Sequence, residues 1–176
     1  MIIHIISDDK FFALGCEWVV KTKSTHELNK ISPNNASREY LKKIVNHDDI
    51  VLIATNSFFK TKKLLISLSC IGIRALVVED FIIKKVHGSI HKKSCQNTLL
   101  SNIEKICRKN NPSRTILTKR EIEVMNGTLQ GKSMKSISLS LNIALKTAYI
   151  HRRNAYVKIG IRKYKIPIKN RKHSSL

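Results

Sequence analysis

The sequence lacks any long apolar run and any pair of closely spaced cysteines. No stretch approaches the roughly 18 apolar residues that a membrane-spanning helix requires. No two cysteines are arranged as C-x-x-C, which excludes a zinc ribbon and a dithiol redox motif. We therefore expect a cytoplasmic protein with reduced, mostly buried thiols. These thiols belong to Cys16, Cys70, Cys95 and Cys107.

Signals for catalysis are also missing. The chain has no glycine-rich loop that could cradle a phosphate group, and no nucleophile stands beside a base. We therefore expect a protein that is not an enzyme and needs no cofactor. The opening run Ile2–Ile6 has no basic lead and continues into Asp8 and Asp9. This pattern predicts a buried strand rather than a signal peptide.

Acidic residues are scarce. The 176 residues include 33 Lys and Arg but only 12 Asp and Glu, for a formal net charge of +21. Residues 113–176 contain 15 of the basic residues and 2 of the acids, whereas residues 1–112 contain 18 and 10. A polyanion is therefore the first partner to consider. The concentration of charge at the carboxyl-terminal end favours nucleic acid over an anionic membrane.

Short apolar runs alternate with helical patterns in the amino-terminal part. Ile2–Ile6, Ile50–Ile53 and Ile73–Val78 are rich in β-branched residues, a pattern typical of strands covered on both faces of a parallel sheet. Between them, Lys63–Leu68 has a helix-like pattern. Another helix is predicted where apolar residues recur at helical spacing, at Phe11, Leu14 or Gly15, Trp18 and Val19. The alternation predicts an α/β domain with a small parallel sheet.

Three further segments complete this organisation. Ser24–Ser37 is polar and is predicted to be a loop. Asn97–Arg108 is amphipathic, so we expect a helix that closes the domain or contributes to a dimer seam. Residues 109–114 have no apolar side chain and include a proline, which indicates a linker. We therefore predict an α/β domain over residues 1–108 and an all-α domain over residues 115–176.

The order of strand, acidic pair and helix resembles the opening of a response-regulator receiver domain. In that family the acidic pair helps to hold Mg²⁺ beside a phosphorylated Asp at the end of a later strand. If Ile50–Ile53 is that strand, Ala54 stands at the acceptor position, and its methyl group cannot form an acyl phosphate. Alternatively, this strand is the family's fourth, and the third is lost or degraded around residues 25–35. Either alignment implies a degenerate receiver without an acceptor.

Asp8 and Asp9 allow two interpretations. They are either a loop and N-cap pair before the helix or a working metal site. The family's lysine near its last strand has no secure counterpart, because Lys84 and Lys85 stand at the wrong offset.

Residues 117–161 have the pattern of two helices joined by a tight turn and followed by a basic helix. Thr118 and Glu121 form a capping-box signature, which predicts that the first helix begins at Lys119. Gly131 is suited to a left-handed helix end. Ser133 can cap the second helix, and a turn is expected at Asn142 before the third.

The third helix, from Leu145 onward, is predicted to bury one face and expose another. Ala148, Ala155 and Ile159 recur at three- and four-residue intervals and should face inward, with His151 or Arg152 partly buried. An outward face with Arg, Lys, Asn and apolar groups fits a major groove, where Arg can bind guanine edges and apolar groups meet thymine methyls. This face contains Lys146, Tyr149, Ile150, Arg153 and Asn154.

These residues resemble the LuxR-type helix-turn-helix over about 45 positions. The shared positions include Leu117-Thr118-x-Arg120-Glu121-x-Glu123-Val124-Met125, Gly131, Ile137, Leu141-x-Ile143, Lys146-Thr147, His151, Asn154 and Lys158-Ile159-Gly160. The resemblance implies a four-helix DNA-binding domain, usually dimeric, whose third helix enters the major groove. The run Tyr149–Ala155 also resembles enterobacterial regulators of fimbrial and common-pilus operons.

The resemblance assigns candidate roles to individual residues. It implies that Tyr149, Ile150 and Arg153 read bases, whereas other side chains lie beside the DNA backbone. The complete candidate set for DNA binding is Ser133, Lys135, Lys146, Thr147, Tyr149, Ile150, His151, Arg152, Arg153 and Asn154.

Three residues depart from the family pattern. Gly127 takes an apolar core position and costs the helix about 1 kcal/mol relative to Ala. Ala144 replaces the Ser or Thr that caps the recognition helix, at a cost of about 1 kcal/mol. Pro167 falls where the family's fourth, dimer-forming helix belongs, so dimerisation is expected to move to the amino-terminal domain.

The leading hypothesis is a bacterial transcription regulator that binds promoter DNA sequence-specifically and independently of phosphorylation. The expected partners are double-stranded DNA, a second copy or another regulator, and RNA polymerase as a candidate. One alternative is a non-canonical two-component response regulator that still receives phosphate. Another is an accessory regulator that heterodimerises and has weak DNA affinity of its own.

Overall fold

The computed structural model describes residues 1–79, 89–108 and 117–160. The predicted linker, Lys84, Lys85 and Pro167 lie outside the described residues, so the predictions made for them are not addressed. The strands are β1 (Ile2–Ser7), β2 (Glu27–Ile31), β3 (Ile50–Ala54), β4 (Arg74–Glu79) and β5 (Ser89–His91). The helices are α1 (Lys10–Lys23), α2 (Arg38–Ile44), α3 (Phe58–Cys70), α4 (Gln96–Arg108), α5 (Lys119–Leu129), α6 (Met134–Ser140) and α7 (Leu145–Ile159).

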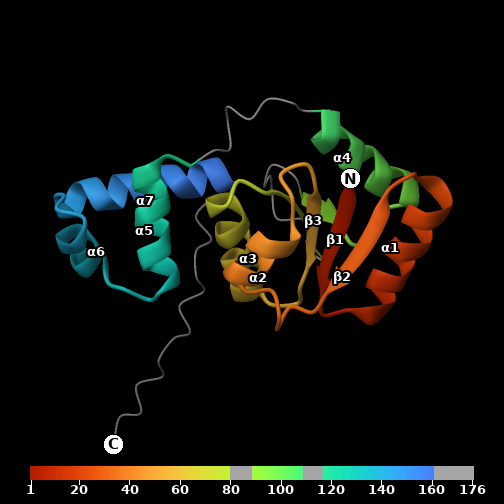
Figure 1. Cartoon of the computed structure of the whole chain (residues 1–176), viewed down its shortest axis with the longest axis horizontal. Helices are drawn as coiled ribbons and strands as arrows, with labels where there is room; N and C mark the ends of the chain where they lie inside the picture. The colour runs from red at the N-terminus through yellow and green to blue at the C-terminus, as the bar shows by residue number, and fades with distance from the viewer. Residues whose placement is uncertain (80–88, 109–116, 161–176) are drawn as a thin grey trace, which may run out of the picture.

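The five strands form one parallel sheet in the order β2-β1-β3-β4-β5. This is the strand order of doubly wound receiver-type folds. Alternate residues of β3 serve the two faces: Val51 and Ile53 pack with α2 and α3, whereas Ile50 and Leu52 pack with α1 and α4. Helices therefore cover both faces, and the predicted α/β fold with a parallel sheet is confirmed (Figure 1).

Helix α3 joins this α/β part to the helical part formed by α5, α6 and α7. All five residues of Leu64–Leu68 are buried, so this helix is covered both by the sheet and by α5 and α7. Met125 and Ala155 belong to the same apolar cluster as Leu65. At the edge of this contact, the Lys62 ammonium lies 4.8 Å from the centre of the Tyr156 ring. One continuous apolar core therefore connects the two parts, and Figure 1 shows α3 between the sheet and the helical part.

The prediction of a loop over Ser24–Ser37 was wrong. This segment contains β2, which forms the edge of the sheet beside β1. An edge strand needs few apolar residues, and only Ile31 of β2 is buried. The presence of β2 also rules out the alternative in which the third strand is lost around residues 25–35. Ile50–Ala54 is the third strand of the described order, and Ala54 ends it.

Helix α1 is present where it was expected, but its apolar residues are divided between two faces. Cys16, Val19 and Val20 are buried against the sheet. Phe11, Leu14 and Trp18, which share the predicted helical spacing, point into solvent with exposed fractions of 87%, 55% and 56%. The spacing of these apolar residues correctly predicts a helix, but it does not identify the face of the helix that packs against the sheet.

Helix α4 covers the face of the sheet on which α1 lies. This agrees with the expectation that the segment closes the α/β domain. Leu99 and Ile103 are buried in the cluster that contains Ile3 and Leu76. Of the three cysteines whose side chains the structure describes, Cys16 and Cys70 are buried, as expected, whereas Cys95 just before α4 is exposed. None of the helices in the described part of the chain is both long and apolar enough to cross a membrane.

A buried carboxylate anchors the amino-terminal ends of β1 and β3. The Asp49 side chain accepts hydrogen bonds from the backbone N–H groups of Ile2 at 2.7 Å and Asn46 at 2.9 Å. Its second oxygen also lies 3.4 Å from Nε2 of the buried His4. Burial alone would raise the pKa of Asp49, but these hydrogen bonds together hold the pKa below the usual value of an aspartate.

We predict that Asp49→Ala lowers the free energy of unfolding by about 2–4 kcal/mol, because two partly buried backbone N–H groups lose their acceptor and the buried His4 ring loses its partner. A folded-state pKa below the unfolded value means that this stabilisation is present at neutral pH. It is lost as the pH falls through the lowered pKa. Urea unfolding of both proteins from neutral to acidic pH measures the difference. Asp48→Ala, which removes an exposed carboxylate, is the control and should change stability by less than about 0.5 kcal/mol.

Candidate functional site

Hydrogen bonds define the start of α5 as the sequence predicted. The Thr118 hydroxyl accepts from the backbone N–H of Glu121 at 3.3 Å, and the Glu121 carboxylate accepts from the backbone N–H of Thr118 at 2.8 Å. Both halves of the capping box are therefore present. Gly131 follows the helix with a φ of 75°, which is the left-handed conformation expected there.

The turn between α6 and α7 also matches the prediction. The Ser133 hydroxyl caps α6 by accepting from the backbone N–H of Ser136 at 3.1 Å. Asn142 has a φ of 51°, and the backbone N–H of Ile143 then donates to the carbonyl of Ser138 at 3.0 Å. This left-handed residue reverses the chain within a few positions and sets α7 across α6.

The recognition helix α7 lacks a side-chain cap, as predicted, because Ala144 makes no capping hydrogen bond. Packing holds the helix instead. Ala148 and Ala155 are completely buried, and these small side chains allow close contact with the helices behind them. Close to its other end, the Lys158 ammonium lies 2.8 Å from the Glu121 carboxylate on α5.

Glu121 is the residue that links α5 to α7. Only 3% of its surface is exposed. Burial alone would raise the pKa of its carboxyl, but the hydrogen bonds from Lys158 and from Thr118 lower the pKa below the usual range. The charged carboxylate therefore caps one helix and fixes the orientation of the other at the same time.

Most of the predicted DNA-binding residues are exposed, and the exposed ones on α7 share one face of that helix. Thr147, His151 and Arg152 are half-buried at the edge of this surface. The Arg152 guanidinium lies 4.9 Å from the centre of the Tyr149 ring, within the range of a cation–π interaction. The exposed members of the set are Ser133 and Lys135 on α6 and Lys146, Tyr149, Ile150, Arg153 and Asn154 on α7.

Sequence reasoning missed Val157 as a member of the outward face. Its exposed fraction is 67%, and it follows Ile150 and Arg153 at helical spacing. The signal was present, because residues 146, 150, 153 and 157 repeat every three or four positions. The expected inward positions of Ala148 and Ala155 are confirmed.

Gly127 has a packing role that the sequence did not reveal. A Cβ atom at this position would lie 2.7 Å from Cγ1 and 2.9 Å from Cδ1 of Ile137 on α6. Ile137 is itself buried, with 1% of its surface exposed, so it has little room to move. The glycine thus allows α5 and α6 to approach closely, and this approach offsets its poor helix propensity.

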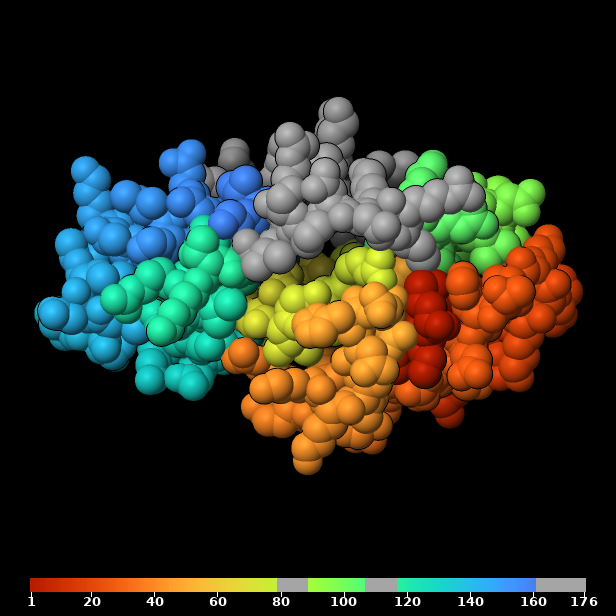
Figure 2. Space-filling view, turned by 45° about the horizontal axis from the view of Figure 1, so that its top comes forward, coloured from red at the N-terminus to blue at the C-terminus, as the bar shows by residue number. Residues whose placement is uncertain are grey.

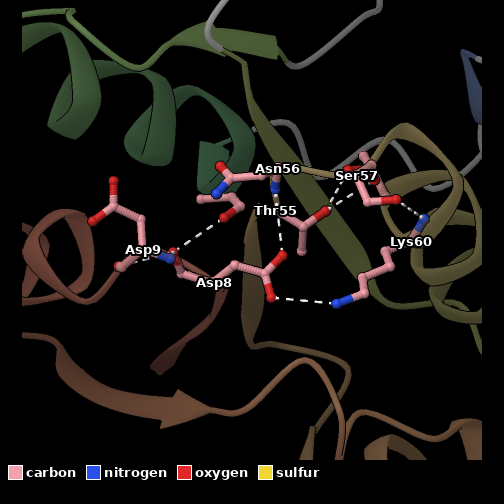
Figure 3. A network of polar contacts seen from close by, with 9 residues as sticks. Asp8, Asp9, Thr55, Asn56, Ser57 and Lys60 are labelled. Carbon is pink, nitrogen blue, oxygen red and sulfur yellow. Dashed lines mark hydrogen bonds and ion pairs between the residues drawn. The ribbon is translucent and has the colours of Figure 1, made fainter.

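A second group of polar residues lies at the carboxyl ends of β1 and β3 (Figure 3). Asp9 caps α1 by accepting from the backbone N–H of Phe12 at 3.0 Å, which confirms the N-cap interpretation for this residue. The Asp8 carboxylate points instead toward Asn56 and Lys60, and its oxygens lie 3.3 Å from the Asn56 backbone nitrogen and 3.5 Å from the Lys60 ammonium. The two carboxylates therefore do not converge on one point.

Lys92 was missed because β5 was not predicted. It directly follows β5, at the carboxyl edge of the sheet, and its ammonium lies 2.6 Å from the Asp9 carboxylate. The hydrogen bond from Lys92 lowers the pKa of Asp9. Lysine ammonium groups thus balance both acids at this edge, Lys92 at Asp9 and Lys60 at Asp8.

This arrangement does not fit the Mg²⁺ that receiver domains hold. The acceptor position at the end of β3 is Ala54, which offers no oxygen from its side chain. Each of the two remaining carboxylates is already paired with a lysine. Within residues 1–79, 89–108 and 117–160, no three His, Cys, Asp or Glu side chains gather to hold a metal ion. A magnesium site needs several oxygen ligands directed at one point, and the two carboxylates at this edge are directed to different lysines.

Comparison with known families identifies the helical part. Residues 115–165 match the family model described as bacterial regulatory proteins, luxR family. The match spans all of α5, α6 and α7, whose caps and turn form the helix-turn-helix described above. The chain is therefore a DNA-binding regulator with a helix-turn-helix, and this segment belongs to the luxR family of bacterial regulators.

Solved structures of response regulators are similar over most of the chain. The low-resolution structure of StyR has 18% identity, covers 92% of this chain and 93% of its own, and has a TM-score of 0.46. RcsB from Salmonella enterica serovar Typhimurium has 14% identity, coverages of 93% and 94%, and a TM-score of 0.45. FixJ from B. japonicum has 15% identity, coverages of 92% and 91%, and a TM-score of 0.41. Scores in this range transfer no residue role to this chain.

We predict that Gly127→Ala lowers the free energy of unfolding by about 1–2 kcal/mol, although alanine is the better helix former. The added methyl group overlaps the buried Ile137 side chain. Thermal unfolding of the wild type and the variant tests this. Gly15→Ala is the matched control, because a Cβ there meets no atom within 4 Å, and it should raise stability. If Gly127→Ala were also stabilising, the close approach of α5 and α6 would not be a constraint.

Proposed function

We propose that this protein is a transcription regulator that binds promoter DNA sequence-specifically through α7, as a dimer with itself or another regulator, and without control by phosphorylation. It acts at the nucleoid, in the cytoplasm, with RNA polymerase as a candidate partner. The observation that carries this proposal is the outward face of α7, on which Arg153, Asn154 and Lys146 are exposed together within the luxR-family segment.

The chemistry of this face supports base reading. Arg153 can donate two hydrogen bonds to the edge of a guanine, and Ile150 beside it can contact a thymine methyl group. Lys146 and Ser133 lie near the amino-terminal ends of α7 and α6, where backbone N–H groups also favour phosphate. The strongly positive charge of the chain adds attraction that does not depend on sequence.

The remnant acidic site supports independence from phosphorylation. Ala54 cannot accept a phosphoryl group, and Lys60 and Lys92 neutralise the carboxylates that would otherwise attract a metal ion. The alternative of a non-canonical response regulator requires another acceptor at this edge. The alternative of an accessory regulator predicts weak DNA binding by the purified protein alone.

The direct experiment is binding of the purified protein to fragmented genomic DNA at physiological salt, followed by footprinting of the retained fragments. We expect discrete protected sites that share a sequence. Retention without a common sequence, or no retention unless a second regulator is added, would favour the accessory role over the proposed one.

We predict that two variants of α7 separate base reading from phosphate attraction. Arg153→Ala should cost about 1–3 kcal/mol on the footprinted site and relax base preference, because it removes contacts to a base edge. Lys146→Ala should weaken binding to all sequences and reduce the salt slope by about 1, because it removes a phosphate contact. Fluorescence anisotropy over a range of salt concentrations measures both effects. Equal losses on specific and random DNA for Arg153→Ala would reject its base-reading role.

We predict that acetyl phosphate with Mg²⁺ neither adds mass to the protein nor changes its affinity for the footprinted site, because the acceptor position is an alanine. Intact-mass spectrometry and anisotropy, performed on the same samples, test this. Uptake of one phosphoryl group that Asp9→Ala abolishes would contradict the prediction and support the response-regulator alternative.

A further inference from the structure

The exposed side of α1 has a property that the packing of a single chain does not explain. Phe11, Leu14 and Trp18 form an apolar stripe, with exposed fractions of 87%, 55% and 56%, and Gly15 lies within it. Glycine is unfavourable inside a helix unless something must approach closely. Among the described residues no atom approaches Gly15, because a Cβ there would meet none within 4 Å.

From the stripe and its glycine, we infer that α1 is a homodimerisation surface, on which the α1 helix of a second copy packs antiparallel with its crossing point at Leu14 and Gly15. This inference deepens the dimer of the proposed function by naming its surface and its partner. Its test uses no DNA, so a protein that dimerises but fails to bind DNA would refute the proposed function alone.

The positions of the stripe residues are symmetric, which favours a second copy over an unrelated partner. Residues 11 and 18, and likewise 14 and 15, are equally distant from one midpoint in the helix. A two-fold axis through that midpoint places Phe11 against the partner's Trp18 and Leu14 against the partner's Gly15. Large side chains then face one another at both ends, and a large side chain meets the glycine in the middle. Such self-complementarity is what an isologous interface requires.

Charges around the stripe are compatible with this pairing. The chain is strongly positive overall, so two copies repel each other unless the contact is locally balanced. Beside the stripe, Glu17 pairs with Lys21 at 2.8 Å and with Lys30 at 2.5 Å. The Glu17 carboxylate therefore offsets part of the positive charge beside the stripe.

The area of the stripe sets the strength of the contact. Two largely exposed aromatic side chains and a leucine offer roughly 400 Å² per copy, or about 800 Å² for the pair. Stable interfaces bury about 1,200–2,000 Å². A groove of about 320 Å³ lined by Lys10, Ala13 and Leu14 runs beside the stripe and can receive part of the partner. The dimer is therefore expected to dissociate in the micromolar range, and two linked DNA half-sites would reinforce it.

The stripe lies far from the surface proposed to bind DNA. Helix α1 is at the opposite end of the molecule from α5, α6 and α7 (Figure 1), and the space-filling view shows the same separation between the orange-red and blue ends (Figure 2). A partner on α1 therefore leaves the outward face of α7 accessible.

Trp18 is the single tryptophan of the chain, so its fluorescence reports directly on this surface. Sedimentation velocity and Trp18 emission of the full-length protein, recorded from nanomolar to high-micromolar concentration, test the inference. We expect the mass to double and the emission to shift to the blue with one shared midpoint. Because salt screens the repulsion between the two positive chains, higher salt should strengthen this dimer.

Gly15→Gln is the decisive variant, because it should raise the melting temperature of the chain while blocking the close approach of the partner's Leu14. We expect its dissociation constant to rise about tenfold or more. Leu14→Glu should also abolish the dimer. Phe59→Ser, which alters an apolar side chain on α3 with 72% exposure, is the control and should leave the midpoint unchanged.

Exchanging the large and small side chains at positions 14 and 15 tests whether these two positions face each other across the two-fold axis. The variant Leu14→Ala with Gly15→Leu restores a large side chain against a small one, so it should regain most of the affinity that Gly15→Gln loses. An exchange variant as weak as Gly15→Gln would reject the register. A chain that is monomeric at every concentration, or a dimer that Leu14→Glu leaves intact, would overturn the inference. So would a blue shift that occurs only on anionic vesicles.

Discussion

The two parts of this molecule depend on the burial of one helix. Helix α3 is covered on one side by the sheet and on the other by α5 and α7, so Leu64–Leu68 is buried without interruption. A helical segment whose residues are buried on every side cannot end a domain against solvent, because its outer side would then be exposed. The helical part therefore completes the core of the α/β part. Any movement that separates the two must expose the apolar side of α3.

Within the helical part, a buried charge compensates for a missing cap. Ala144 leaves the start of α7 without a side-chain acceptor, whereas Glu121 holds the same helix near its other end through Lys158. The carboxylate is already fixed by the backbone of Thr118, so the ion pair has little freedom to lose when it forms. The orientation of the outward face thus depends on a residue of α5 that does not belong to that face.

The sequence was most informative where a local pattern has a single structural solution. The capping box at Thr118, the left-handed turn at Asn142 and the buried strand ending at Ala54 each follow from a few neighbouring residues. It was least informative where distant segments decide. Polar β2 is a strand because it pairs with β1. Phe11 and Trp18 are exposed because Cys16 and Val20, on the other side of α1, pack against the sheet. Lys92 reaches Asp9 only because β5 lies at the edge of the sheet.

The lysines at the carboxyl edge of the sheet explain how the receiver-type fold remains stable without its usual ligand. Neighbouring carboxylates such as Asp8 and Asp9 repel one another unless a cation lies between or beside them. In this chain Lys60 and Lys92 supply that charge permanently, from α3 and from the end of β5. These two ion pairs are the physical basis of the proposed independence from phosphorylation. What the α/β part can still contribute to regulation is its surfaces, namely the buried side of α3 toward α7 and the open side of α1.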